Sequence, residues 1–270
     1  MGDTANVVCP KGYRGFESLP LRQMSKSEPN NLEPYLFYGI VLPERAQLSL
    51  GFEVSFSHLT SGFPGKAKVS IILNQIVVLV ETDREWNILD LRNVVKTLLQ
   101  NYLAMVGYLK GCAYDLEITR VLNQNKNVDH VFGIDIPCIE ERNRSIDIQQ
   151  ALSELRDKTR GENGILINRC LNDLIASMSH ADDTGFYCYR AIESLRHHCA
   201  AVHKLSGTDK KQQWKKFTEI SGYDQDAILP IKEVADPLRH GEASKMTSEQ
   251  RANLFKLTWD IVDAYLKNAQ

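Results

Sequence analysis

The sequence lacks three features, each of which would have placed the protein in a broad class. It has no apolar run of the roughly 18 residues needed to cross a membrane. It has no Cys-x-x-Cys pair, the spacing on which many zinc and thiol redox sites are built. It also has no basic excess, because 34 Asp and Glu outnumber 32 Lys and Arg, which gives a formal net charge of −2. Any contact with nucleic acid would therefore require a local basic patch.

The six cysteines are spread along the chain, at positions 9, 112, 138, 170, 188 and 199. Together with the absence of a recognisable secretory signal, this pattern predicts reduced thiols that pack as small apolar side chains in a cytoplasmic protein. Cys199 and His203 have a spacing that suits a metal on one helix. The sequence offers no second pair of ligands, so we predict no metal and no cofactor.

Residues 1–23 have neither a helical nor a strand period. Phe16-Glu17-Ser18 can be encoded as TTC-GAA-TCC, the T-loop sequence of a transfer RNA gene, and the codons up to Gln23 reach its acceptor stem and CCA end. We expect these residues to be either a translated tRNA-gene leader ahead of Met24 or a disordered tail, and we exclude them from fold prediction. Integrating elements favour the 3′ ends of tRNA genes, so the first interpretation makes the gene cargo of a bacterial mobile element.

The spacing of apolar residues differs between the two halves of the remaining sequence. Strands are predicted at 35–42, 49–59, 67–82, 114–122 and within 131–137. Within 67–82, the "LNQI" stretch is expected to turn one hairpin strand into the next, although Asn-Gln lacks the Gly that two-residue turns prefer. One helix is predicted from Asp90, as its N-cap, to Gly111, where it ends. Further helices are predicted at 147–159, 165–181, 185–205, 210–220, 226–238 and 248–268, the last with a capping box of Thr247 and Gln250.

The predicted fold class is therefore α+β. Residues 24–145 are expected to form an antiparallel sheet with one packed helix, and residues 146–270 an all-α helical bundle.

Three polar residues share one face of the predicted helix 185–205. Arg190, Glu193 and His197 fall at i, i+3 and i+7, so Glu193 can pair with Arg190 or hold one tautomer of His197. An imidazole in this setting exchanges protons near neutral pH. The alternative is a solvated face, whose ion pairs add only about 0.2–0.5 kcal/mol each. The pattern leaves both interpretations open.

Arg239 and His240 lie at the end of the predicted helix 226–238, just before Gly241, a suitable left-handed stop. His240 in a last helical turn interacts favourably with the helix dipole and needs no further role. An Arg beside a His can also bind a phosphate and transfer a proton, because Arg presents planar hydrogen-bond donors and His is the common acid or base. We take Arg239 and His240 as the candidate catalytic pair, supported by Arg190, Glu193 and His197.

The stretch from "FYCYRAIESL" through Trp214 to "ADPLRHGE" and "VDAYL" resembles HEPN-type helical bundle domains. The resemblance implies a bundle whose active members cleave RNA without a metal, at a composite site built by two protomers. Their motif is Arg, a polar residue, four to six positions, then His. Arg239 and His240 are adjacent and depart from this motif, whereas Arg190 and His197 meet the spacing on an earlier helix. This departure leaves open a degenerate, non-catalytic member.

Two functions are therefore expected. The first is an RNA-binding or metal-independent RNA-cleaving effector of a mobile element or defence system, whose product ends in a 2′,3′-cyclic phosphate. The second is a non-enzymatic dimeric interaction or nucleotide-binding module with a degenerate site. Both imply a homodimer, and neither involves a membrane. RNA or a nucleotide is the expected ligand, and in the second function the sheet half can instead bind a protein or another ligand.

Overall fold

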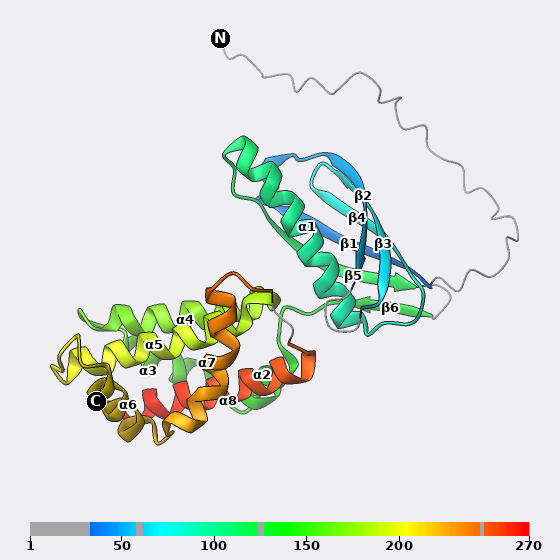
Figure 1. Cartoon of the computed structure of the whole chain (residues 1–270). Coiled ribbons are helices and arrows are strands. Elements are labelled where there is room, and N and C mark those ends of the chain that lie inside the picture. The colour runs from blue at the N-terminus through cyan, green and yellow to red at the C-terminus, as the bar shows by residue number, and fades with distance from the viewer. Residues whose placement is uncertain (1–32, 58–61, 124–126, 244–245, 270) are drawn as a thin grey trace, which may run out of the picture.

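The computed structural model describes residues 33–57, 62–123, 127–243 and 246–269, so the expected leader at 1–23 lies outside the described residues. The described chain forms a sheet half followed by a helical half (Figure 1). The sheet half contains β1 (Glu33–Leu42), η1 (Glu44–Ala46), β2 (Leu50–Ser57), β3 (Pro64–Ile72), β4 (Gln75–Thr82), α1 (Ile88–Lys110), β5 (Asp115–Asn123) and β6 (Val128–Val131). The helical half contains α2 (Pro137–Asn143), α3 (Ile148–Lys158), α4 (Gly164–Ser179), η2 (Ala181–Asp183), α5 (Thr184–Val202), α6 (Lys210–Ser221), α7 (Gln225–Arg239) and α8 (Ser248–Asn268).

The sheet is antiparallel throughout, in the order β2-β3-β4-β1-β5-β6. Strand residues alternate between buried and exposed along β3 and β4, which is the pattern of a sheet with one covered face. Helix α1 lies along that face (Figure 1) and buries Leu91, Val95, Leu99 and Leu103. The predicted antiparallel sheet with one packed helix is therefore confirmed.

The β3–β4 hairpin turns on Leu73 and Asn74, with φ angles of 46° and 70°. Two-residue hairpin turns of this kind usually use Gly, and Asn is among the residues that tolerate a left-handed conformation. The side chain of Asn74 also accepts a hydrogen bond from Leu48 N (2.6 Å) and donates to Glu44 O (2.6 Å). These contacts explain why the turn forms without glycine.

Two local predictions differ from the structure. Helix α1 begins at Ile88, because the side chain of Asn87 accepts hydrogen bonds from the backbone N–H groups of Leu89 and Asp90; Asp90 is therefore in the first turn and is not the N-cap. The last strand is β6, which precedes most of the segment predicted for it. The rest of that segment leads into α2, where Pro137 occupies the first turn, a position that proline favours.

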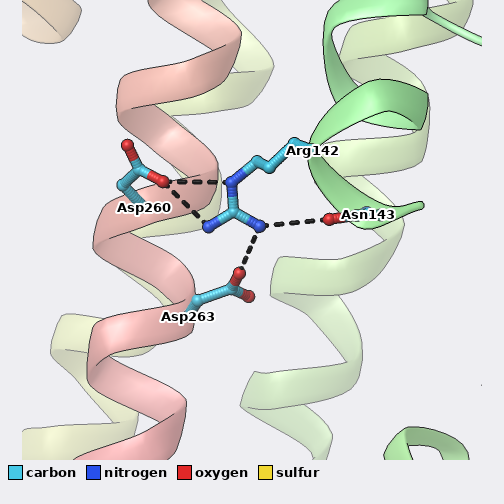
Figure 2. A network of polar contacts seen from close by, with 4 residues as sticks. All are labelled: Arg142, Asn143, Asp260 and Asp263. Carbon is cyan, nitrogen blue, oxygen red and sulfur yellow. Dashed lines mark hydrogen bonds and ion pairs between the residues drawn. The ribbon is translucent and has the colours of Figure 1, made fainter. Parts of the chain in front are cut away.

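Helix α2 packs with the helical half although its sequence lies before residue 146. Ile139 is part of the helical core, and Arg142 on α2 forms ion pairs with residues of α8. The Arg142 guanidinium donates to Asp260 Oδ1 (2.8 Å) and contacts Asp263 Oδ2 (2.6 Å), as Figure 2 shows. The change from one hydrophobic core to the other thus falls before α2.

Helix α5 is the centre of the helical half and contacts α4, α6, α7 and α8. Its seam residues Cys188, Ile192, Leu195 and Cys199 have no exposed surface. Burying each such Leu or Ile side chain contributes about 1.5–3 kcal/mol. The predicted helical bundle is confirmed, as is the capping box at the start of α8. No helix in the described ranges has the length and apolar character to cross a membrane.

Candidate nucleic-acid interface

Arg239 and His240 lie at the C-terminal end of α7, and both are exposed. The Arg239 guanidinium is 3.6 Å from a carboxylate oxygen of Asp236, about one turn earlier. Gly241 has a φ of 84°, the expected left-handed stop. The imidazole of His240 makes no hydrogen bond or ion pair with any residue that the structure describes. The pair therefore stands open to solvent.

Arg190 is held by a contact within the bundle. Its guanidinium donates to Oδ1 of Asp173 on α4, a side chain that is only 4% exposed. This hydrogen bond raises the pKa of Arg190. The guanidinium also lies over the ring of Tyr187, 4.9 Å from its centroid. Arg190 therefore anchors α5 to α4.

Glu193 pairs with Arg196, at 3.7 Å, and not with Arg190. The side chain of Arg196 is only 4% exposed. Its Nη1 donates to Gln213 Oε1 on α6 (2.6 Å), and its Cζ lies 5.1 Å from the centroid of the Trp214 ring. This buried cation, which the sequence analysis did not single out, is the centre of the site.

Arg196 also sets the tautomer of its neighbour. Its Nη2 lies 3.1 Å from His197 Nε2. A guanidinium can only donate, so Nε2 must accept, and the neutral imidazole carries its proton on Nδ1.

His197 is exposed and lies near three cations. Partial burial lowers its pKa below 6.5, and the charges of Arg196, Lys210 and Arg169 lower it further, while Glu193 opposes them. Protonation at Nε2 would also place a positive N–H against the Arg196 donor. His197 is therefore predominantly neutral at pH 7.

The surroundings of His197 form a local basic surface. Residues 204–216 contain five lysines and one aspartate. Lys210, Lys211 and Lys215 are exposed on α6, whose opposite face is buried through Gln213 and Phe217. We call this the α4–α6 surface and define it as Arg169, His197, Lys210, Lys211, Trp214 and Lys215.

Tyr189 connects this surface with the end of α7. Its ring stacks on Trp214 with centroids 6.5 Å apart. Burial raises its pKa, and the charges of Glu193, Arg196, Asp236 and Arg239 all act on it. The structure therefore brings Arg239 toward the Arg196 cluster, whereas no contact among the described residues joins His240 to His197.

The cysteines serve mainly as core residues. Cys170, Cys188 and Cys199 are buried, as predicted, while Cys112 is exposed. Burial raises the pKa of the Cys199 thiol, and His203, its spacing partner, is exposed at the end of α5. Within the described ranges, no group of three or more His, Cys, Asp or Glu side chains is placed to hold a metal ion.

The fold and surface define a two-domain α+β protein whose helical domain carries a basic, aromatic-containing face. Residues 35–132 match the model of the N-terminal domain of DUF8168, a domain of unknown function, and residues 152–270 match the model of its C-terminal domain. The matches occur in order and together span most of the chain, so the chain belongs to the DUF8168 family. No curated protein and no solved structure matches it.

Proposed function

We propose that this protein binds RNA through the α4–α6 surface. The observation that carries the proposal is an exposed imidazole, His197, that contacts Arg196 and lies within electrostatic reach of Arg169 and Lys210. Phosphate groups are attracted to such a cluster through charge-assisted hydrogen bonds. The overall charge of −2 does not oppose local binding, because salt screens charges more than about 10 Å away.

Trp214 supports single-stranded RNA as the form that binds. The ring is partly exposed, and its contacts with the Tyr189 ring and the Arg196 guanidinium fix its position. A base stacked on an aromatic side chain contributes about 1–3 kcal/mol, and only unpaired bases are free to stack in this way. The HEPN resemblance of the same helices points to the same ligand.

Metal-independent cleavage is the catalytic form of this proposal. The 2′-hydroxyl attacks the adjacent phosphate, the 5′-oxygen leaves with a proton, and a 2′,3′-cyclic phosphate remains. The step needs a base for the 2′-hydroxyl. The pKa of His197 is lowered, and its Nε2 takes this proton when a bound phosphate draws Arg196 Nη2 away from that atom. The imidazolium then returns a proton to the leaving 5′-oxygen. Cations beside it stabilise the charge that develops on the phosphate. Arg239 and His240 are the second candidate pair for this step.

The test measures binding and cleavage separately. Binding is followed by the fluorescence anisotropy of a labelled single-stranded RNA, and cleavage by product analysis in the presence of EDTA. We expect saturable binding by the wild type and by His197→Ala. If the protein cleaves, we expect a cyclic phosphate end that is lost in His197→Ala and retained in His240→Ala.

A loss of cleavage in His240→Ala alone would assign the chemistry to the end of α7. RNA binding without cleavage would leave a binding protein with a degenerate site. Failure to bind RNA at physiological salt would contradict the proposal as a whole.

The dimeric interaction module is the second candidate function. An apolar groove of about 500 Å³ runs between α7 and α8, with Val234, Leu238, Leu254 and Leu257 in its wall. Grooves of this size and character also bury partner side chains. Light scattering across a concentration series tests the expected homodimer, and a monomer at every concentration would contradict it.

A further inference from the structure

A cleft of about 490 Å³ lies between the two halves of the protein. One wall is the polar face of α1, and the other is formed by the end of α4 with η2. Two hydrogen bonds join these walls: Lys96 Nζ donates to Ser179 O (2.8 Å), and Thr97 Oγ1 donates to Asp182 Oδ2 (2.7 Å). The volume is typical of sites for small molecules, which range over about 300–1,000 Å³.

Arg92 lines this cleft with a guanidinium that has no polar partner among the described residues. Its Nε is buried without a hydrogen-bond partner, and none of its nitrogens makes a hydrogen bond or ion pair with a described residue. Its contact is with the ring of Phe132, whose centroid lies 5.1 Å from Cζ. Burial lowers the pKa of Arg92, and Glu117 offsets this only in part. A desolvated charge without a partner is costly.

The neighbouring cations are satisfied in a different way. Arg251 donates to Ser177 O (3.3 Å) and Met178 O (3.1 Å), and Lys96 binds the next carbonyl. Both therefore cap the C-terminal end of α4, where cations are favoured. Arg251 and Lys96 lie close enough to Arg92 for their pKa values to be lowered by its charge. The carbonyl groups at the end of α4 therefore accept hydrogen bonds from Lys96 and Arg251, but none accepts one from Arg92.

A second unsatisfied group lines the same cleft. Gln100 Oε1 is buried without a donor, while its amide nitrogen donates to Tyr114 O (3.3 Å). Carboxylates also line the cleft, among them Glu117, Asp135 and Asp183. They repel a polyanion, so the ligand that fits carries a single oxyanion group together with a hydrogen-bond donor.

We infer that the cleft binds a small polar molecule through one carboxylate or phosphate group, which the Arg92 guanidinium holds in its plane. Arg favours planar, two-point contacts with both kinds of oxyanion, and the Phe132 ring fixes the guanidinium for such a contact. The site is separate from the α4–α6 surface, so it goes beyond RNA binding.

The test uses the arginine reagent phenylglyoxal on the wild-type full chain, with modification of each arginine measured by peptide mass spectrometry. The reaction is run in inorganic phosphate, in acetate and in chloride at equal ionic strength. The internal control is Arg160, which is 73% exposed and forms an ion pair with nearby Asp157. We expect phosphate, acetate or both to slow modification of Arg92 saturably, by about tenfold at ten times the dissociation constant, and to leave Arg160 unchanged.

Protection by phosphate alone would identify a tetrahedral oxyanion, and protection by acetate alone a carboxylate. Equal rates for Arg92 in all three salts would overturn the inference. A second measurement compares Arg92→Gln with Arg160→Gln. We expect phosphate or acetate to raise the Tm of the wild type and of Arg160→Gln, but not that of Arg92→Gln. Arg92→Gln should still bind RNA like the wild type. Loss of that rise in both variants, or in neither, would also overturn the inference.

Discussion

Removing two lysines from α6 should change how RNA binding depends on salt. Binding to single-stranded nucleic acid releases counterions, so the logarithm of the association constant falls with the logarithm of salt concentration with a slope of about −0.7 per phosphate contacted. The α4–α6 surface offers four exposed cations at its edge: Arg169, Lys210, Lys211 and Lys215. If each contacts one phosphate, the expected slope for the wild type is about −2.8.

Lys210→Gln/Lys211→Gln should therefore reduce the slope to about −1.4. Between 50 and 200 mM salt the wild type should lose about fifty-fold in affinity, and the double variant only about seven-fold. The assay is fluorescence anisotropy with a labelled single-stranded RNA across a salt series. Both lysines are exposed on a helix whose packing is made by other residues, so the variant should fold normally.

The matched control is Lys66→Gln/Lys110→Gln, which removes the same charge from exposed positions of the sheet half. Its slope should equal that of the wild type. Equal reductions in the two double variants would show that net charge, and not this surface, governs binding. An unchanged slope in Lys210→Gln/Lys211→Gln would refute the assignment of these lysines.

Three further predictions concern stability and reactivity. Burial lowers the pKa of His198, so the unfolded state binds more protons than the folded state below about pH 6.5. The contribution of His198 to stability is therefore present above about pH 6.5 and lost below it. In His198→Gln, the free energy of unfolding, measured by denaturation at a series of pH values, should fall less steeply below pH 6.5, by at most about 1.4 kcal/mol per pH unit. Arg142 and Asp260 are partly exposed, so a double-mutant cycle should give a coupling of about 0.2–1 kcal/mol that weakens in high salt; a coupling near zero would assign no stability to the contact. Cys112 should react with a thiol reagent in the folded protein, whereas Cys188, whose burial raises its pKa to about 11, should react only on unfolding; equal rates would contradict the packing.

The fold was largely predictable because its elements are regular. Alternating residues in β3 and β4 and the apolar stripe of α1 each have a clear period. The start of α1 was missed because Asn87 and Asp90 are both good N-cap residues, and local sequence does not decide between them. Helix α2 was missed because it is short and is held mainly by tertiary contacts, such as those of Arg142 with α8.

The candidate site was less predictable because its central residue is a buried charge. Helical spacing placed Arg190, Glu193 and His197 on one helix face, whereas in the structure Arg190 pairs with Asp173 and Glu193 with Arg196. Periodicity cannot indicate that Arg196 is buried, since its partner Gln213 comes from another helix. The available signal was the run "KKQQWKK" in α6, which combines lysines with a tryptophan in a chain of negative net charge.

Photochemical cross-linking of RNA containing 4-thiouridine, followed by peptide mass spectrometry, tests the central claim most directly. If RNA occupies the α4–α6 surface, the cross-linked peptides should come from residues 197–216, which include His197 and Trp214. Cross-links confined to residues 35–132, or none at an RNA concentration that saturates binding, would contradict the account.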